Sequence, residues 1–123
     1  KKVTVVDDQF GRLTFVGDMA RTILDALHSD VPYGTYNLTS GGRTTNWCEV
    51  ARCVFDLTCG NGDAVEGVPT KDYNANAKGR ISPRPCNSVL DLSKIQAVGF
   101  PQPDWELSLR RYVLELVNCN QWK

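Results

Sequence analysis

The chain has 123 residues, of which 41% are hydrophobic and 23% are charged, a balance typical of one globular domain and not of a disordered segment. Its 14 basic residues match its 14 acidic residues, so no net charge directs it to nucleic acid or to an anionic membrane. No apolar run reaches the length of a membrane span, which predicts a protein without a membrane-embedded segment.

The start of the chain and its cysteines indicate what kind of protein the chain comes from. The chain opens on Lys1, Lys2 and Val3 inside a strand-like pattern and without an initiator methionine, so we expect a piece of a longer protein. The five cysteines are odd in number and irregularly spaced, which favours neither a disulfide framework nor a zinc site. We interpret them as small apolar side chains of a cytoplasmic protein.

The first half of the chain predicts alternating strands and helices. Residues 2–8 are strand-like, and residues 9–14 form a loop around Gly11. An apolar stripe predicts a helix from Val16 to about His28, and residues 34–39 predict a short strand. Asn46 and Glu49 match the capping box of a further helix, which ends at the glycines of residues 60–62.

The second half predicts one strand, a long loop and two helices. Residues 64–68 read as a strand and residues 70–80 as a loop, after which prolines keep the chain extended as far as residue 90. Asp91 caps a predicted helix over residues 92–98. Pro103 suits the first position of the last helix. The apolar stripes of the helices place Trp47, Trp105 and Tyr112 in the core.

Four stretches then occur in a characteristic order, at residues 5–14 (VVDDQFGRLT), 17–20 (GDMA), 34–39 (GTYNLT) and 84–91 (RPCNSVLD). Together they resemble the C-terminal portion of the dTDP-4-dehydrorhamnose reductases, which are extended short-chain dehydrogenases/reductases. The implied fold is α/β, a small substrate-binding portion with few short strands and about four helices, without the N-terminal Rossmann half. Residues 1–123 are then a single C-terminal, substrate-side domain of a longer parent chain.

The resemblance implies that the parent reduces dTDP-4-dehydro-L-rhamnose to dTDP-L-rhamnose with NADPH or NADH, for cell-surface polysaccharide. In this family a Rossmann domain holds the cofactor, and a Tyr with a Lys four residues later handles the proton. Here no glycine-rich turn follows a strand, and no Tyr precedes a Lys at that spacing. We therefore expect this chain alone to bind no cofactor and to have no reductase activity. Its expected partners are the N-terminal Rossmann domain of the parent and the dTDP-sugar.

Five residues are the predicted substrate contacts. Because the loop of residues 8–14 lies near the substrate cleft in this family, Gln9 and Thr14 are expected to bind hydroxyls and Arg12 a diphosphate, with Gly11 shaping the turn. Leu13 departs from the proline usual there. Arg84 is expected beside the same cleft, with Lys78 and Arg80 as further cations in its loop. The alternatives are solvated loop residues at positions 9 and 12, and a structural arginine that holds an aspartate or loop carbonyls at position 84.

Two other functions stay open at this point. The stretch at residues 84–91 also resembles the regulatory beta subunit of methionine adenosyltransferase, a non-catalytic member of the same superfamily that binds a partner enzyme. A free-standing domain that forms a homodimer through its exposed strand edges is a further alternative.

Overall fold

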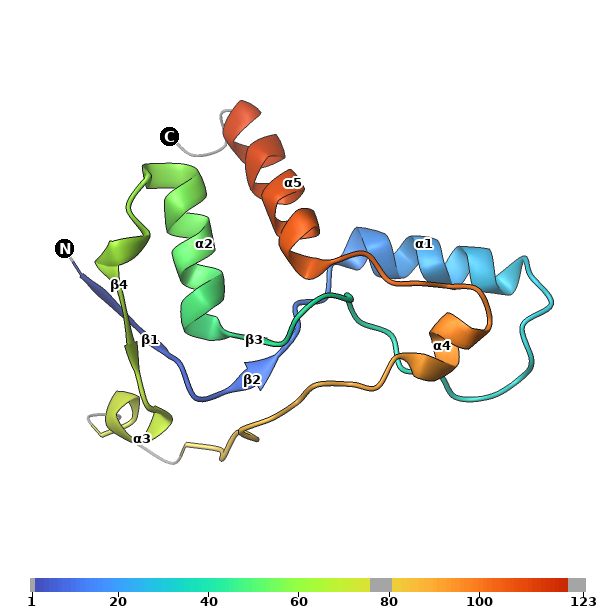
Figure 1. The fold of residues 1–123 in the computed structure, drawn as a ribbon, viewed down its shortest axis with the longest axis horizontal. Coiled ribbons are helices and arrows are strands. Elements are labelled where there is room, and N and C mark those ends of the chain that lie inside the picture. The colour runs from blue at the N-terminus through green and yellow to red at the C-terminus, as the bar shows by residue number, and fades with distance from the viewer. Residues whose placement is uncertain (1, 76–80, 120–123) are drawn as a thin grey trace.

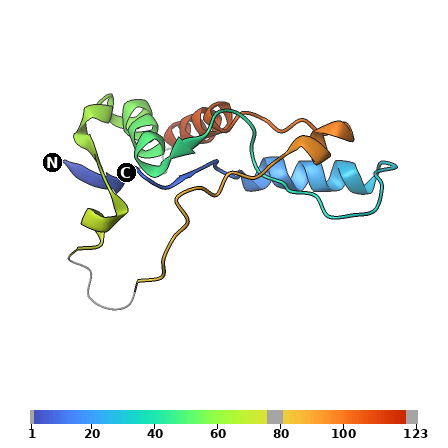
Figure 2. The same cartoon turned by 60° about the horizontal axis from the view of Figure 1, so that its bottom comes forward.

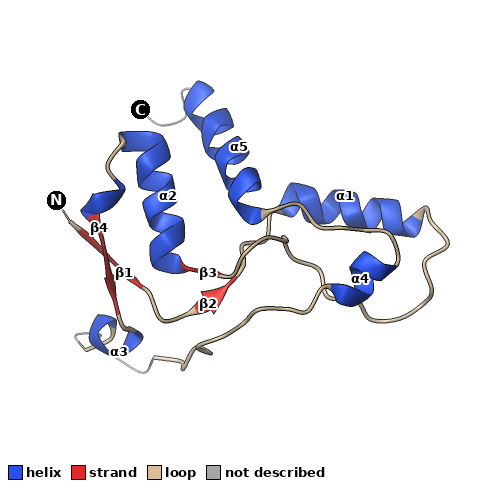
Figure 3. Ribbon diagram, in the orientation of Figure 1, coloured by secondary structure: helices blue, strands red, loops and turns tan. Residues whose placement is uncertain are grey.

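The computed structural model describes residues 2–75 and 81–119, which form five α-helices, one 3-10 turn and four short strands (Figures 1 and 3). In chain order they are β1 (Val3–Val6), β2 (Phe10–Gly11), α1 (Val16–Leu27), β3 (Thr45–Asn46), α2 (Trp47–Cys59), the 3-10 turn (Gly62–Ala64), β4 (Val65–Val68), α3 (Thr70–Tyr73), α4 (Ser93–Ala97) and α5 (Trp105–Asn118). Figures 1 and 2 both show an elongated molecule, with β1, β4 and α2 toward one end and α1 and α4 toward the other. The few short strands among helices confirm the α/β expectation.

The strands pair in two separate ribbons. β1 and β4 are parallel, in register from Val3 opposite Val65 to Val6 opposite Val68. The chain that joins them includes α2, which packs against both, because parallel neighbours need a long crossover. β2 and β3 are antiparallel, with Phe10 opposite Asn46. Phe10 also bridges to Asn87, so the extended segment around residue 87 lies along the other edge of β2.

The core lies between α2 and α5. Trp105 is completely buried and forms a cluster with Leu109 and Val113, against which side chains of α2 pack. The indole Nε1 of Trp105 donates a hydrogen bond to the carbonyl of Arg43 over 2.8 Å, which satisfies its only polar atom. Trp105 was therefore correctly placed in the core from its helical stripe. Tyr112 was not, because its side chain is half exposed, and its ring centroid lies 6.3 Å from that of Phe15 in a tilted arrangement.

The helix ends follow local capping chemistry. The Asn46 side chain accepts the N–H of Glu49 over 2.9 Å, as predicted. Glu49 does not complete the capping box, because its carboxylate accepts from Arg43 and Thr45 instead, and the Arg43 hydrogen bond keeps the pKa of Glu49 below its ordinary value. The last helix begins at Trp105 with Asp104 as its N-cap, so the predicted start at Pro103 is wrong.

The stretch predicted as a strand at residues 34–39 is irregular in the structure. No ladder partner among the described residues runs beside it. Single contacts fix it instead: Asn37 donates from its amide to the Asp91 carbonyl over 3.0 Å, and Thr39 donates from its hydroxyl to the Leu13 carbonyl over 3.2 Å. Its strand-like composition therefore did not decide its conformation.

A one-turn helix, α3, replaces the first part of the predicted loop at residues 70–80. The carboxylate of Asp8, 62 positions earlier, accepts both the backbone N–H and the hydroxyl of Thr70. These hydrogen bonds, the hydroxyl first, lower the pKa of Asp8. The cap comes from a distant part of the chain, so no local signal could announce it. Residues 76–80 of that loop lie outside the described residues.

The apolar stripe of α1 faces outward. Val16 and Leu27 are 79% and 76% exposed, and Ile23 and Leu24 are exposed as well. The buried residue of this helix is Asp18, whose carboxylate accepts hydrogen bonds from Ser108 and Arg111 of α5. Among the residues described, no helix is long and apolar enough to cross a membrane.

Candidate functional site

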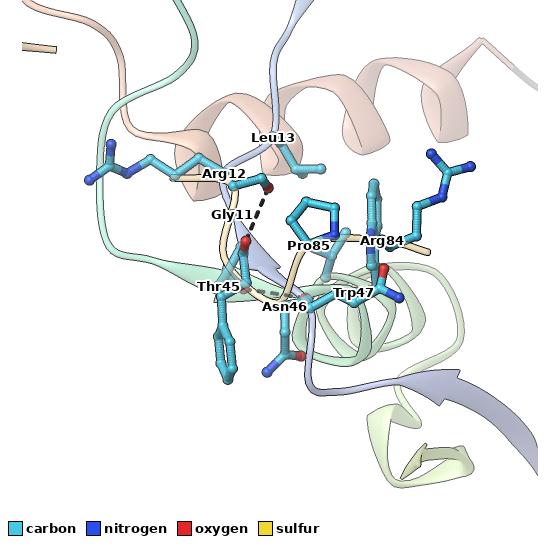
Figure 4. Close-up of a pocket in the computed structure, with 12 residues that line it drawn as sticks. Gly11, Arg12, Leu13, Thr45, Asn46, Trp47, Arg84 and Pro85 are labelled. Carbon is cyan, nitrogen blue, oxygen red and sulfur yellow. Dashed lines mark hydrogen bonds between the residues drawn. The ribbon is translucent and has the colours of Figure 1, made fainter. Parts of the chain in front are cut away.

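A cavity of about 490 Å³ opens where three segments distant in sequence meet (Figure 4). The segments are the loop that contains β2, the junction of β3 with α2, and the extended chain at residues 84–88. Its lining residues are Gln9, Phe10, Gly11, Arg12, Leu13, Thr45, Asn46, Trp47, Val50, Arg84, Pro85 and Ser88.

Backbone hydrogen bonds hold the three segments together. The N–H of Phe10 donates to the Cys86 carbonyl and the N–H of Ser88 donates to the Phe10 carbonyl, each over 2.8 Å. On its other edge, β2 pairs with β3. The segments are so close at Gly11 that a Cβ there would lie 2.8 Å from the Ser88 hydroxyl oxygen. A glycine at position 11 therefore allows the two segments to approach each other closely, and its expected role in shaping the loop has a steric basis.

Four of the five predicted contacts line this cavity: Gln9, Gly11, Arg12 and Arg84. Gln9 donates from its amide to the hydroxyl of Thr70 over 2.9 Å, and Thr70 is held in turn by Asp8. This chain of hydrogen bonds ties the first cavity residue to the start of α3.

The side chain of Arg12 extends away from Arg84 in Figure 4. Its guanidinium donates to the Gly42 carbonyl over 3.0 Å and to the Leu90 carbonyl over 3.2 Å. In this arrangement Arg12 joins two loops, so the role of holding loop carbonyls, considered above for Arg84, is filled by Arg12.

Thr14 lies outside the cavity. Its hydroxyl is 2.6 Å from the hydroxyl of Thr39, and both line a much smaller hollow with Asp18. The structure therefore separates Thr14 from the other four predicted contacts.

Arg84 is exposed at the cavity wall. Within residues 2–75 and 81–119, no hydrogen bond or ion pair engages its guanidinium. A planar cation of this kind offers paired donors to phosphate oxygens. The two other cations expected in this loop, Lys78 and Arg80, lie outside the described residues.

Sequence reasoning missed the aromatic lining. Trp47 was placed in the core by its helical stripe, yet it is 54% exposed and lies in the cavity wall beside Arg84 and Pro85 (Figure 4). The stripe continues one turn beyond the core, because α5 covers Val50 and Val54 but not the first residue of α2. Phe10 is half exposed at the same cavity.

The cysteines divide between the core and the surface. Cys48 is buried, and burial raises the pKa of the partly covered Cys53 thiol. Cys59, Cys86 and Cys119 are exposed, so the interpretation as apolar fillers is wrong for them. No group of three or more His, Cys, Asp or Glu side chains among the described residues is arranged to hold a metal ion.

The cavity is chemically suited to binding. Its described lining offers one guanidinium without an internal partner, several amides and hydroxyls, and two aromatic side chains. It contains no carboxylate, imidazole, thiol or phenol among the described residues, the groups that usually transfer protons. This lining fits a ligand that combines an anionic group with a flat apolar ring.

The comparisons with known proteins agree on one family. Residues 1–118 match the RmlD substrate binding domain. A dTDP-4-dehydrorhamnose reductase of Aggregatibacter actinomycetemcomitans is 35% identical over 86% of this chain and 38% of its own length. The spore coat polysaccharide biosynthesis protein SpsK of Bacillus subtilis is 30% identical over 94% of this chain and 38% of its own length.

Solved structures agree with the sequence relatives. The dTDP-4-dehydrorhamnose reductase of Clostridium acetobutylicum superposes with a TM-score of 0.79 at 30% identity, over 95% of this chain and 39% of that one. The reductase of Bacillus anthracis, solved in complex with NADP, gives 0.75 at 29% identity, over 94% and 38%. The chain thus spans about 38% of the length of these relatives. The resemblance found in the four sequence stretches is confirmed, and the chain belongs to the RmlD substrate binding domain family.

Proposed function

We propose that this chain is the substrate-binding part of an NAD(P)H-dependent reductase that converts dTDP-4-dehydro-L-rhamnose to dTDP-L-rhamnose. The observation that carries the proposal is the cavity, because the loop of residues 9–13 and the segment of residues 84–88 meet there. These two segments also carry the family resemblance. Arg84 is the proposed contact to the diphosphate, and Gln9 and Gly11 shape the adjoining wall.

Arg12 and Thr14 are proposed to support the substrate site by holding its loops in place, and not by direct contact with the substrate. Arg12 supports the loops around the ligand through its two carbonyl contacts. Thr14 supports them through its contact with Thr39. Both act on the substrate through the position of the loop, and a direct contact would require either side chain to leave its present partner.

The catalytic half is proposed to lie in a longer parent chain. The relatives are more than twice as long as this chain, and the B. anthracis reductase carries NADP. The sequence here has no Tyr followed four residues later by Lys and no glycine-rich turn after a strand. The parent is therefore proposed to take NADPH or NADH on an N-terminal Rossmann domain, in the cytoplasm, while residues 1–123 alone neither bind the cofactor nor turn over substrate.

The test compares the natural full-length protein with residues 1–123. Purified full-length protein should oxidise NADPH or NADH when dTDP-4-dehydro-L-rhamnose is added, and residues 1–123 should not. Arg84→Ala in the full-length protein should raise KM by about 10- to 100-fold, the effect of losing one charge-assisted hydrogen bond. Arg110→Ala is the control, because Arg110 is half exposed on α5 and pairs with Glu106 away from the cavity.

Two results would contradict the proposal. An unchanged KM in the Arg84→Ala enzyme would remove the argument for that residue. A full-length protein that turns over no dTDP-sugar but associates stably with an adenosyltransferase would favour the regulatory subunit.

A further inference from the structure

Trp47 is the largest side chain of the cavity wall, and it is unusually open to solvent for its size. It is 54% exposed, whereas Trp105, on the neighbouring helix of the same core, is fully buried. A large exposed aromatic at a concave site contributes little to folding, and such side chains are enriched where proteins bind ligands and partners. Packing within residues 2–75 and 81–119 therefore does not explain its position.

The backbone that carries Trp47 is held on both sides. Asn46, immediately before it, pairs with Phe10 in the β2–β3 ribbon and caps α2 through the N–H of Glu49. Cys48, immediately after it, is 1% exposed. The backbone on either side of Trp47 is fixed while its indole face is exposed. Such a side chain is prearranged for a ligand, since little conformational entropy is lost on binding.

The small polar side chains beside Trp47 are already engaged. The Ser88 hydroxyl donates to the Phe10 carbonyl over 3.1 Å, and the Thr45 hydroxyl donates to the Glu49 carboxylate over 2.9 Å. The amide oxygen of Asn46 accepts the cap hydrogen bond. Among the described lining residues, the Arg84 guanidinium and the indole of Trp47 have no hydrogen-bond partner, and Asn46 and Gln9 each use only one end of their amide, the oxygen and the N–H2 respectively.

Because few polar side chains near Trp47 are free to form hydrogen bonds, the site favours a nucleobase over a hexose against the indole. A hexose carries hydroxyls around its ring, and each hydroxyl buried without a partner weakens binding. A nucleobase has two flat apolar faces, which stack on an aromatic ring without any polar partner. Figure 4 shows Trp47 beside Arg84, so a base on the indole leaves the attached diphosphate within the neighbourhood of the guanidinium.

We propose that Trp47 is a binding residue for the nucleotide: its indole face stacks on the base of a nucleoside diphosphate whose phosphates contact Arg84. This inference rests on the proposed function and extends it, because it assigns the base and the diphosphate to different residues of one cavity.

The test measures ligand affinity of the full-length protein by titration calorimetry with two probes, dTDP, which has a base and no hexose, and inorganic pyrophosphate, which has no base. Trp47→Ala should weaken dTDP binding about 10- to 100-fold, in line with the usual strength of base–aromatic stacking. It should leave pyrophosphate binding unchanged. Trp47→Phe should retain dTDP affinity within a few-fold, because an aromatic face remains. Arg84→Ala should weaken both probes.

Tyr73→Ala is the matched control. Tyr73 is also 54% exposed, but it does not line the cavity. Its loss should leave the affinity for both probes unchanged. The same set of variants is then assayed for turnover, where Trp47→Ala should raise KM and leave kcat nearly unchanged.

Three outcomes would overturn the inference. If Trp47→Ala leaves dTDP binding intact but raises KM for dTDP-4-dehydro-L-rhamnose in the turnover assay, the indole contacts the sugar. If it affects neither while Arg84→Ala still weakens binding, Trp47 lies outside the ligand site and the proposed function stands without it. If the wild-type protein binds no dTDP at all, the proposed function itself fails.

Discussion

The contact between α1 and α5 depends on one buried carboxylate, and its removal is the most informative test of the fold. Asp18 is 5% exposed in the first turn of α1. Its two oxygens accept a hydrogen bond from the Ser108 hydroxyl over 2.6 Å and one from the Arg111 guanidinium over 2.9 Å. The apolar stripe of α1 is exposed, so this polar contact is a main connection between α1 and α5.

Asp18→Asn keeps the size of the side chain and removes its charge. The amide oxygen can still accept from Arg111, and the amide N–H2 can donate to the Ser108 hydroxyl, which then acts as the acceptor. The substitution therefore removes the charge that assists both hydrogen bonds. A hydrogen bond to a charged group contributes about 1.5–3 kcal/mol, and the half-exposed position of Arg111 favours the lower part of that range. In the full-length protein we expect the urea midpoint to fall by roughly 0.5 M, because the dependence on urea increases with protein size.

The effect should depend on pH in a defined direction. The hydrogen bond from Ser108, followed by that from Arg111, lowers the pKa of Asp18 in the folded protein. The stabilisation is then complete above the unfolded pKa of about 3.9 and is lost as the pH falls through the lower folded value. Wild type and Asp18→Asn should therefore differ near neutral pH and converge in acid.

The assay is urea unfolding of the full-length protein, followed by circular dichroism near pH 7 and near pH 3. Asp25→Asn is the control, because Asp25 is exposed on the same helix and its side chain has no partner among the described residues. Equal midpoints for wild type and Asp18→Asn near neutral pH would refute the reasoning. A difference that persists undiminished in acid would refute its electrostatic part.

Three further changes test the walls of the cavity. Gly11→Ala should weaken dTDP binding, because its Cβ would lie 2.8 Å from the Ser88 oxygen, and adding Ser88→Ala should restore binding; failure to restore it would show that the steric argument is wrong. Asn46→Ala should lower the free energy of unfolding by about 1 kcal/mol in urea titrations, since it removes the acceptor for the Glu49 N–H, whereas Asn46→Asp should be nearly neutral. Arg12→Ala should lower the thermal midpoint, because two loop carbonyls lose their donor, and a raised KM at an unchanged midpoint would instead indicate direct substrate contact.

The sequence alone determined the features that depend on near neighbours. The start of α2 follows from Asn46, and its end follows from Gly60, which adopts a positive φ of 62°. The burial of Trp105 follows from a stripe with a 3.6-residue period. The family followed from four ordered stretches, because their spacing is a property of the chain and needs no coordinates.

Only the tertiary structure decided the features that depend on distant partners. β2 and β3 have two residues each and exist because they pair with each other, and α3 forms where Asp8 reaches Thr70. Residues 34–39 have the composition of a strand but no strand to pair with among the described residues.

The cavity shows the same division. Sequence stretches pointed to Gln9, Gly11 and Arg84, which do line it, because the resemblance already contained their positions. Periodicity placed Trp47 in the core, yet the neighbouring helix does not extend far enough to cover it. An apolar stripe shows which side of a helix is apolar. The extent of the surface that packs against the helix decides which residues of the stripe are buried and which stay exposed.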